Sequence, residues 1–378
     1  MEIGDFFEGI VMNDERVDNL TRQILAHGVD GVALVPGPNM MYLSGIHSHL
    51  SERPIVLFFP ADDEPAIIIP VLEAMKARDA GIAEERIFAW SDQEGYTGAF
   101  QQACAHLELS DYLLGVEALH MRVLEWELLK RYAPGLATTH AEPIVMALRL
   151  IKDEAELAAM DRAVAVAEKA MGELVPHIKT GMTEKQVAAL LTRLLLEGGA
   201  DAIAFSPIVA AGPNSASPHA AATNRRLQEG DLLVIDWGCT VDDYPSDITR
   251  TFAVGAIDPE LRRVYDVVRL ANEQGKLATR PGASGQEVDR AAREVIEDSG
   301  YGEYFIHRTG HGLGLEIHEP PFIMPGNREP LTAGNVFTIE PGIYLPERGG
   351  VRIEDDVVVT ADGYRSLTTF TRDLITVG

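Results

Sequence analysis

Cysteine is scarce in this sequence of 378 residues, which contains only Cys104 and Cys239. Disulfide frameworks need several paired cysteines, and a structural zinc site built on thiolates takes two to four of them close together. Two isolated cysteines far apart in the chain give no reason to expect either. We therefore expect both side chains to be buried, inert thiols, and any metal site to use other residues.

Basic residues and long apolar runs are also lacking. The chain has 32 Lys and Arg residues against 58 Asp and Glu residues, a formal net charge of -26. So acidic a surface repels phosphate backbones and anionic lipids, which argues against nucleic-acid and membrane partners. Residues 1–8 are acidic and do not resemble a signal peptide, and no apolar run reaches the length of a membrane span. The sequence therefore predicts a cytoplasmic protein.

Two domains are expected from the length and the 46% hydrophobic content, which is ample for two buried cores. In residues 1–148, short apolar strands alternate with amphipathic helices, as is typical of a three-layer α/β domain. None of these helices follows a glycine-rich phosphate loop, so no nucleotide site is expected there. The predicted helices are 14–27, 71–78, 97–107 and 121–131, and the predicted strands are 31–35, 54–59 and 66–69.

The second domain, residues 149–378, is expected to begin with a long helix near Lys152, after a boundary between residues 142 and 153. Acidic residues follow Lys152 directly, and carboxylates in a first turn stabilise the positive end of a helix. A second long helix follows, and strands dominate thereafter. The later predicted helices are 183–197, 259–277 and 284–298, and the predicted strands are 209–210, 232–235, 249–254, 335–339 and 351–359.

Four carboxylates and one imidazole stand out in this domain as candidate metal ligands. Two aspartates flank apolar strands, one histidine opens the motif His-Gly-Leu-Gly-Leu-Glu-Ile-His-Glu-Pro-Pro, and two glutamates interrupt apolar segments. In chain order they are Asp236, Asp247, His311, Glu340 and Glu354. Oxygen ligands with a single nitrogen suit Mn2+, Co2+ or another first-row divalent ion, and four negative charges exceed what one dication neutralises. The set therefore indicates two metal ions.

Each of these residues alone has a simpler explanation. An acid such as Asp236 or Asp247 usually just provides the polar end of a strand, and a single histidine such as His311 is more often structural than a ligand. Glu340 and Glu354 resist this explanation, because a buried carboxylate must be protonated, paired or bound to a metal. The prediction of a metal site therefore depends on the five residues together.

The order and spacing of these residues resemble those of the pita-bread metallopeptidases, which include methionine aminopeptidase, aminopeptidase P and prolidase. The family's ligands follow the order Asp, Asp, His, Glu, Glu, and all five are present here. Two further histidines of the family match His219 and His318, and Arg352 resembles the pattern of the proline-specific branch. The resemblance implies a creatinase-like N-terminal domain and a C-terminal pita-bread α+β domain with a curved, mainly antiparallel sheet.

Asp243 departs from the family pattern, since relatives usually have glycine at this position. It lies between Asp236 and Asp247, whose spacing is unchanged. Aspartate tolerates unusual backbone angles nearly as glycine does. We expect Asp243 to occupy a turn between two strands and to leave the ligands undisturbed.

The resemblance also implies a division of roles around two divalent metal ions, with Mn2+ expected before Co2+ or Zn2+. Asp247 and Glu354 would bridge both ions, Asp236 would bind one, and His311 with Glu340 would complete the other. Water held between two metals loses a proton readily, and the metals polarise a scissile carbonyl. Glu340 would in addition act as the general base that takes the proton of this water.

Residues beside the metal ligands are expected to bind the substrate. His219 and His318 would each donate a hydrogen bond, one to the scissile peptide and one to the developing oxyanion, and are therefore catalytic as well as substrate-binding candidates. Arg352 would orient a ligand carboxylate or the substrate. His307 and Arg308 either reach the substrate pocket or pack beside it. Glu319, which follows His318, is expected only to orient its neighbours.

The predicted function is hydrolysis of Xaa-Pro peptide bonds by a prolidase-like dipeptidase, which binds a peptide with proline at the second position. The alternatives are aminopeptidase P action on longer peptides, a small-amide hydrolase of the ectoine-hydrolase kind, and a non-catalytic peptide-binding module. A homodimer is expected, in which the loop carrying His47 and His49 contributes to a pocket or is simply solvated. A dipeptidase also needs a positive group for the proline carboxylate, which the sequence does not identify.

Overall fold

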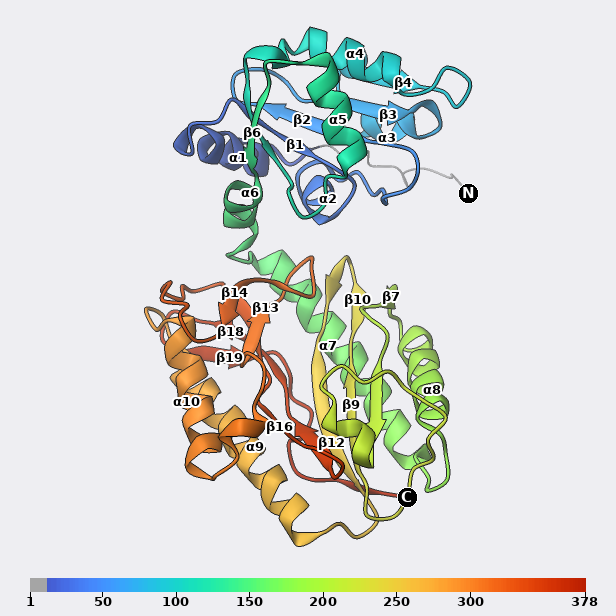
Figure 1. Ribbon diagram of the computed structural model, residues 1–378, viewed down its shortest axis with the longest axis vertical. Helices are drawn as coiled ribbons and strands as arrows, with labels where there is room; N and C mark the ends of the chain where they lie inside the picture. Colours follow the sequence, from blue (N-terminus) through green and yellow to red (C-terminus); the bar gives the residue numbers. More distant parts are fainter. Residues whose placement is uncertain (1–11) are drawn as a thin grey trace, which may run out of the picture. The chain divides into compact units, whose positions relative to one another are not determined.

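The computed structural model describes residues 12–378, so the acidic segment at residues 1–8 lies outside it. The chain divides between Arg149 and Leu150 into two compact units, called here the N-terminal and the C-terminal unit (Figure 1). Within residues 12–378, none of the helices combines the length and the apolar character that crossing a membrane requires.

The N-terminal unit is built on a six-stranded sheet with the strand order β4-β3-β2-β1-β5-β6 (Figure 1). Strand β2 pairs antiparallel with both neighbours, and the other pairs are parallel. Its helices are α1 (Asp14–Ala26), α2 (Pro38–Ser44), α3 (Ala74–Asp79), α4 (Thr97–His106), α5 (Val123–Tyr132) and α6 (Glu142–Arg149). Its strands are β1 (Gly31–Leu34), β2 (Val56–Pro60), β3 (Ala66–Pro70), β4 (Ile87–Trp90), β5 (Leu113–Val116) and β6 (Ala137–His140).

Side-chain alternation along the strands explains the layers of this unit. Successive residues of a strand point to opposite faces of the sheet. Val56 and Phe58 of β2 pack in one apolar cluster with Phe100 of α4 and Leu129 of α5, while Leu57 between them is equally buried outside that cluster. The predicted three-layer arrangement is confirmed. Helix α6 was not predicted, because the segment 142–149 was interpreted as a boundary although it buries an apolar stripe.

The C-terminal unit repeats one order of elements, a pair of helices followed by antiparallel strands. Helices α7 and α8 pack on the sheet β20-β12-β9-β8, and α9 and α10 pack on the strands that follow them (Figure 1). The helices are α7 (Glu154–Leu174), α8 (Glu184–Glu197), α9 (Pro259–Ala278) and α10 (Gly285–Asp298). The curved, mainly antiparallel pita-bread domain is thereby confirmed.

The strands of this unit are short and belong to several small sheets. The second half carries the sheet β14-β13-β15-β18-β19 and the hairpin β16-β17, and β10 joins β11 to β7. Only β12 and β20 pair in parallel. The strands are β7 (Ala202–Ile203), β8 (Ile208–Ala211), β9 (Leu232–Trp237), β10 (Cys239–Val241), β11 (Tyr244–Pro245), β12 (Ile248–Val254), β13 (Gly310–Gly312), β14 (Glu319–Ile323), β15 (Val336–Ile339), β16 (Gly342–Leu345), β17 (Gly349–Arg352), β18 (Asp355–Val359), β19 (Tyr364–Ser366) and β20 (Thr376–Val377).

Three of the four helices in this unit begin with a reciprocal capping box. Asp153 accepts from the backbone of Glu156, whose side chain accepts in return from the backbone of Asp153. Thr183 with Gln186 and Ser284 with Glu287 repeat the arrangement. Such caps satisfy backbone N–H groups that the first helical turn leaves without partners, at about 1 kcal/mol each. They fix where α7, α8 and α10 start.

The predicted strand at 351–359 is wrong in one respect, because it is two strands. Strand β17 ends at Arg352 and pairs with β16, whereas β18 begins at Asp355 and pairs with β15 and β19. Ile353 and Glu354 form the break, and both are buried. The continuous apolar pattern reflected burial rather than one continuous strand. Arg352 therefore ends one strand, and Glu354 directly precedes the next.

Two smaller expectations are confirmed. Cys104 and Cys239 are buried free thiols, and burial raises the pKa of Cys104 to about 12 and that of Cys239 to about 11. Both therefore stay protonated and unreactive at neutral pH. Asp243 has a φ of 68°, in the left-handed region that aspartate tolerates better than most residues, and it lies in the turn between β10 and β11.

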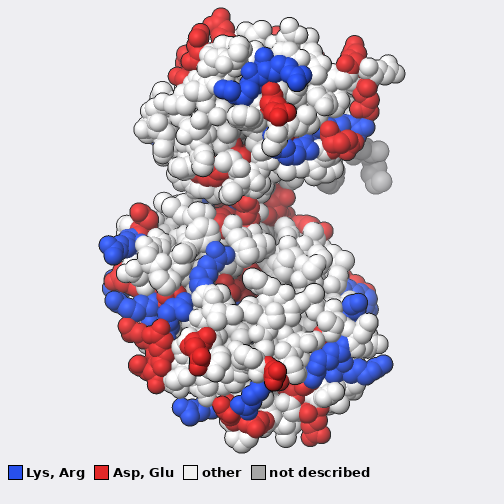
Figure 2. All heavy atoms as spheres, in the orientation of Figure 1, with Lys and Arg blue, Asp and Glu red and all other residues white. Residues whose placement is uncertain are grey.

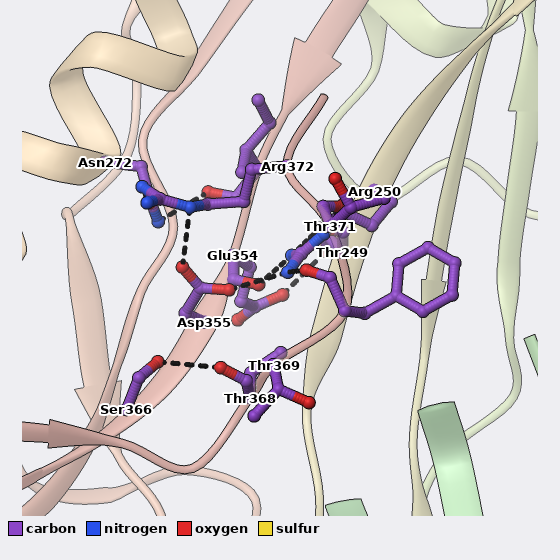
Figure 3. Close-up of polar contacts among 12 residues, drawn as sticks. Thr249, Arg250, Asn272, Glu354, Asp355, Ser366, Thr368, Thr369, Thr371 and Arg372 are labelled. Carbon is purple, nitrogen blue, oxygen red and sulfur yellow. Dashed lines mark hydrogen bonds and ion pairs between the residues drawn. The ribbon is translucent and has the colours of Figure 1, made fainter. Parts of the chain in front are cut away.

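Asp355 lies at the centre of a buried group of cations in the C-terminal unit (Figure 3). Its two oxygens lie 2.7 Å from Arg250 and 2.7 Å from Lys276, and Arg372 is 3.7 Å away. Burial alone would raise the pKa of Asp355, but the charges of Arg250 and Lys276 outweigh it and hold this pKa below its ordinary value. Arg250 also donates to the backbone carbonyl of Glu354, so this charged group supports the chain at that residue.

We predict that Asp355→Asn lowers the free energy of unfolding by about 3–5 kcal/mol, because it leaves Arg250 and Lys276 buried without a full counter-charge. Urea unfolding of the metal-free protein measures this loss. The control is Asp161→Asn, which removes an exposed ion pair to Arg365 and should cost at most about 1 kcal/mol. Equal losses in the two variants would contradict a structural role for the buried group.

Candidate active site

Two of the predicted ligands come from the antiparallel pair β9 and β12. Asp236 lies within β9 and is opposite Thr249 of β12, while Asp247 lies one residue before β12. Asp236 therefore lies one residue before the end of its strand. Its side chain is near the edge of the sheet where Asp247 enters, and antiparallel pairing brings the two carboxylates to the same end of this ladder.

The other two carboxylates are set by the pair β15 and β18. Ile339 pairs with Asp355, so Glu340, the next residue after β15, and Glu354, the residue before β18, both extend one step beyond the ladder. His311 is the central residue of β13, which pairs with β15 through Gly312 and Phe337. A Cβ atom at Gly310 would lie 1.8 Å from the carbonyl oxygen of Thr338. Glycine at 310 therefore permits the close approach that brings His311 to the carboxylates.

Three of the other predicted ligands lie around His311. Its Nε2 lies 3.6 Å from Oδ2 of Asp247 and 3.4 Å from Oε1 of Glu340. Ligand atoms of Asp247, His311 and Glu354 all lie within 4.8 Å of one another, and all three residues are buried. Asp236 is also buried, and within residues 12–378 its Oδ1 has no hydrogen-bond partner. The predicted ligands thus lie in one region of the C-terminal unit.

The protonation pattern of the cluster fits bound cations. Nδ1 of His311 faces the carbonyl oxygen of Gly312 at 3.2 Å, and since a carbonyl only accepts, Nδ1 carries the proton. Nε2 therefore turns its lone pair towards Asp247 and Glu340. A lone pair beside carboxylate oxygens is unfavourable unless a cation or proton lies between them. These donors are the oxygen and imidazole ligands that first-row divalent ions accept.

Repulsion within the cluster shifts its pKa values strongly. Burial, and then the charge of Glu354, raises the pKa of Asp247 well above its ordinary value. Burial and the charge of Glu340 do the same to the pKa of Glu354, and burial raises the pKa of Glu340 to about 8. Burial lowers the pKa of His311 to about 3, so the imidazole stays neutral. In the protein without metal, protons compensate for charge that cations would otherwise neutralise.

Arg352 connects the cluster to its surroundings. Its guanidinium donates to Oδ2 of Asp236 at 2.7 Å, to the hydroxyl of Thr249 at 3.1 Å and to the hydroxyl of Tyr344 at 3.0 Å. Thr249 in turn donates to Oε2 of Glu354 at 2.6 Å. Arg352 is thus bonded to the carboxylate of a predicted ligand, and the orienting role expected for it stays a prediction. The sequence did not reveal Thr249 and Tyr344, because neither residue type signals such a contact.

These residues line a cavity of about 790 Å3 in the C-terminal unit. The five predicted ligands, His219, His318 and Arg352 all face it, as do His307 and Arg308. Part of the wall is apolar, and its residues were not predicted: Phe205, Ile208, Ile317 and Met324. The cavity is therefore large enough for a small peptide, and both charged and apolar groups line it.

His219 and His318 differ from His311 in their surroundings. Both are exposed, and the ring centroid of His318 lies 4.2 Å from that of His311 in an edge-on arrangement. Burial on its inner side lowers the pKa of His318, which favours a neutral ring with one N–H donor. Both histidines therefore border the cavity with groups able to donate to a ligand.

Buried contacts fix the position of the segment that carries His318. Glu319 forms an ion pair of 2.6 Å with Lys152, and both side chains are almost fully buried. A Cβ atom at Gly314 would lie 2.3 Å from the Glu319 carboxylate, so the chain between His311 and His318 folds tightly over it. Glu319 has the orienting surroundings expected for it. Lys152 as its partner was not predicted, since 167 residues separate the two.

His307 is held by a chain of hydrogen bonds. Its Nδ1 lies 2.7 Å from the carbonyl oxygen of Arg308 and must donate to it. Its Nε2 then accepts from the Tyr344 hydroxyl at 2.9 Å. Burial lowers the pKa of His307 to about 4, so the ring is neutral. His307 and Arg308 thus do reach the cavity, the first of the two possibilities left open for them.

His47 and His49 lie in the N-terminal unit, and both are exposed. Lys76 donates to the backbone carbonyl of His47 at 2.8 Å. A contribution of this loop to a pocket stays a prediction.

Comparison with known proteins supports the same interpretation. Residues 158–361 match the model of metallopeptidase family M24, and residues 16–151 match the creatinase/prolidase N-terminal domain. An Xaa-Pro dipeptidase from Pyrococcus furiosus is 34% identical, with 96% of this chain and 99% of the relative covered. Among solved structures, a recombinant prolidase from Thermococcus sibiricus has a TM-score of 0.92 at 35% identity, covering 96% of this chain and 99% of its own.

A dipeptidase PepE from Mycobacterium ulcerans has a TM-score of 0.89 at 35% identity, covering 96% of this chain and 97% of its own. Since the matches extend over nearly the whole length of each relative, they cover both units. The cluster of oxygen and imidazole groups, the cavity beside it and these matches agree. The chain belongs to metallopeptidase family M24 and carries the creatinase/prolidase type of N-terminal domain.

Proposed function

We propose that this metallopeptidase hydrolyses Xaa-Pro peptide bonds and prefers dipeptides, as a prolidase does. The observation that carries the proposal is the convergence of four carboxylates and a neutral imidazole on a cavity large enough for a small peptide. The names of the relatives, Xaa-Pro dipeptidase and prolidase, support the choice of substrate. The cytoplasmic location and the homodimer stay predictions from the sequence and the family resemblance.

The ligands proposed for two divalent ions, with Mn2+ first and Co2+ or Zn2+ as substitutes, are the five converging residues. They are Asp236, Asp247, His311, Glu340 and Glu354, which would hold the ions through four carboxylates and one imidazole. Bound divalent ions would supply positive charge that polarises a carbonyl and favours hydroxide over water. The orphaned Oδ1 of Asp236 and the unprotonated Nε2 of His311 are the atoms that most need such a partner.

Glu340 is proposed as the residue that moves the proton. It lies at the cavity wall with its side chain 15% exposed, so substrate can approach it. A carboxylate at this place can take a proton from water and pass it to the leaving nitrogen. In an Xaa-Pro bond that nitrogen is tertiary and has no hydrogen of its own, so a proton must be delivered when the bond breaks.

His219 and His318 are proposed to bind the scissile peptide. Imidazoles at the cavity wall can donate hydrogen bonds through their ring N–H groups, and donors aimed at the developing oxyanion stabilise the transition state. Arg352 keeps Asp236 in place, and through Thr249 it also supports Glu354. The proline ring needs an apolar surface rather than a hydrogen-bonding partner, and Phe205, Ile208 and Ile317 provide one.

We predict that the metal-free protein is inactive and that added Mn2+ or Co2+ restores cleavage of Xaa-Pro. Initial rates on Xaa-Pro and on Xaa-Pro-Yaa-Yaa, measured side by side with Mn2+, Co2+ and Zn2+, test this. Faster cleavage of the dipeptide is expected. Faster cleavage of the longer peptide would favour aminopeptidase P action. Binding of the dipeptide or the longer peptide without cleavage of either would indicate a peptide-binding module and would contradict the proposal.

We predict that Asp247→Ala or Glu354→Ala abolishes metal-dependent turnover, because a bridging carboxylate contacts both ions. His219→Ala should keep its metal and lower kcat by about 10²–10³-fold, the usual effect of removing one oxyanion donor. Metal content by elemental analysis, together with kcat, separates the two classes. Asp161→Ala, on the exposed surface, is the control. Full activity after loss of a bridging carboxylate would contradict the dinuclear arrangement.

We predict that the metal-free protein loses stability as the pH rises from about 5 to 8. The folded pKa values of Asp247, Glu340 and Glu354 are raised, that of Glu340 to about 8, above the unfolded values near 4. The folded state therefore binds more protons in this range, and stability falls by about 1.4 kcal/mol per pH unit for each such group.

Thermal unfolding from pH 5 to 8, with and without Mn2+, measures this effect. Mn2+ should reduce the slope, because cations stabilise the ionised cluster. Glu340→Gln removes one of the groups and should give a shallower slope without metal. A melting temperature of the metal-free protein that is constant or rises across this range would show that the carboxylates are already ionised.

A further inference from the structure

Glu184 is a buried carboxylate of the C-terminal unit that is neither a predicted metal ligand nor a substrate-binding candidate. Figure 2 shows many acidic side chains at the molecular surface, where water solvates their charge. Glu184 lies in the first turn of α8, where an acid stabilises the positive end of the helix even when it is exposed. Here the residue is 0% exposed. A carboxylate so far from water needs hydrogen-bond donors, and its donors indicate what it does.

The donors to Glu184 come from both ends of one loop, residues 212–222. At the start of the loop, Oε1 accepts from the backbone N–H of Ala211 at 2.8 Å and from the amide of Asn214 at 3.1 Å. At its end, Oε2 accepts from the backbone N–H of Thr223 at 2.9 Å and from the Thr223 hydroxyl at 2.5 Å. Glu184 therefore joins the two points of the chain at which this loop begins and ends.

The backbone of α8 also binds the end of the loop. The N–H of Glu184 donates to the carbonyl oxygen of Arg225 at 3.1 Å, and the N–H of Lys185 donates to that of Thr223 at 3.1 Å. These N–H groups belong to the first turn of the helix, which leaves them without partners inside the helix. The start of α8 thus holds the returning chain through its backbone as well as through the Glu184 carboxylate.

The middle of the loop contacts β17 at the wall of the cavity. The Ser215 hydroxyl accepts from the backbone N–H of Gly350 at 2.8 Å, and a Cβ atom at Gly350 would lie 2.1 Å from the carbonyl oxygen of Ser215. The carbonyl oxygen of Pro218 accepts from Arg352 at 3.1 Å, and His219 follows directly. The loop can make these close contacts only while its two ends hold it at the right distance from β17.

The ring of His219 depends on this backbone for its position. His219 lines the cavity and is exposed, so packing around the ring gives it little support. A hydrogen-bond donor to the scissile peptide must be placed accurately, since a displacement of about 1 Å can lower a rate about 100-fold. The position of the loop therefore decides how well His219 can act.

We propose that Glu184 is a positioning residue for His219, which it holds in place by joining the two ends of the loop 212–222. Glu184 acts on the substrate only through His219. The inference rests on the proposed peptide hydrolysis, in which His219 binds the scissile peptide, and adds to it the group that keeps this histidine at the cavity.

The first test is Glu184→Gln in the Mn2+-loaded full-length protein. Both oxygens of Glu184 accept hydrogen bonds, so an amide NH2 in place of either one would face other donors. The variant should lower kcat for Xaa-Pro by about 10- to 100-fold, the range expected for a misplaced donor. Its KM and its affinity for Mn2+ should each change less than threefold. A kcat within threefold of the wild type would overturn the proposal.

The second test combines Glu184→Gln with His219→Ala. If Glu184 acts through His219, its substitution has nothing left to disturb once the imidazole is gone. The double variant should therefore have a kcat within threefold of that of His219→Ala alone. Losses that multiply in the double variant would show that Glu184 acts by another route and would overturn the proposal.

Glu117→Gln in the N-terminal unit is the matched control. Glu117 is also buried, and it accepts from the backbone N–H of Val35 at 2.7 Å and from the amide of Asn39 at 2.8 Å. Its substitution places an amide among similar donors far along the chain from the loop, and kcat should stay within threefold of the wild type. Equal losses of kcat in Glu184→Gln and Glu117→Gln would reflect lost stability alone and overturn the proposal.

Thr223→Val is a milder variant for the case in which Glu184→Gln does not fold. Thr223 is exposed, and valine removes only the hydroxyl that donates to Glu184. The loss of this one hydrogen bond should lower kcat by about 3- to 10-fold with KM nearly unchanged. A kcat equal to that of the wild type would overturn the proposal.

If the wild type does not cleave Xaa-Pro, the proposed function fails, and hydrogen exchange of the metal-free protein decides the role of Glu184. Glu184→Gln should speed exchange of the backbone amides of Ala211 and Thr223 by about 10-fold or more, with faster exchange across residues 212–222. In Glu117→Gln the loop should exchange as in the wild type. Unchanged exchange of the loop in Glu184→Gln would show that the carboxylate does not hold it.

Discussion

The fold of the C-terminal unit must hold several negatively charged carboxylates close together at one buried site. Asp236, Asp247, Glu340 and Glu354 face one cavity, and two carboxylates about 4 Å apart repel each other by about 4 kcal/mol at the effective dielectric of a protein. Without cations, the structure lessens this repulsion by retaining protons, as the raised pKa values of Asp247, Glu340 and Glu354 indicate. Divalent ions bound there would remove the same repulsion while leaving the carboxylates ionised.

Rigid strands make such a cluster possible, because each ligand lies at or near the end of a hydrogen-bonded ladder. The neighbouring residues Glu354 and Asp355 have surroundings of opposite charge, and their pKa values shift in opposite directions. Glu354 faces other carboxylates, and its pKa is raised. Asp355, the next residue, faces Arg250 and Lys276, and its pKa is lowered. Arg250 bonds both to Asp355 and to the backbone of Glu354, so the cationic group beside Asp355 also supports the chain at Glu354 (Figure 3).

The candidate ligands and the strands that carry them can be predicted from the sequence, because each produces a recognisable local pattern of residues. Apolar periodicity located β9, β12 and β15, and the order of five ligand types was enough to single them out. The break between β17 and β18 was missed, because both strands are buried and their residues are equally apolar. Contacts such as Thr249 with Glu354 or Lys152 with Glu319 join residues more than 100 positions apart. Threonine and lysine occur in so many settings that only the folded chain reveals these roles.

The sequence says least about the arginines, because the partner of each guanidinium is known only from the folded structure. Arg250, Arg308 and Arg352 look alike in the sequence, yet Arg250 and Arg352 each have a buried aspartate partner. Arg308 is half-buried in a chain with 58 acidic residues and still has no ion pair within residues 12–378. A guanidinium partly removed from water without a counter-charge is costly, and cavities retain such groups where a ligand completes them.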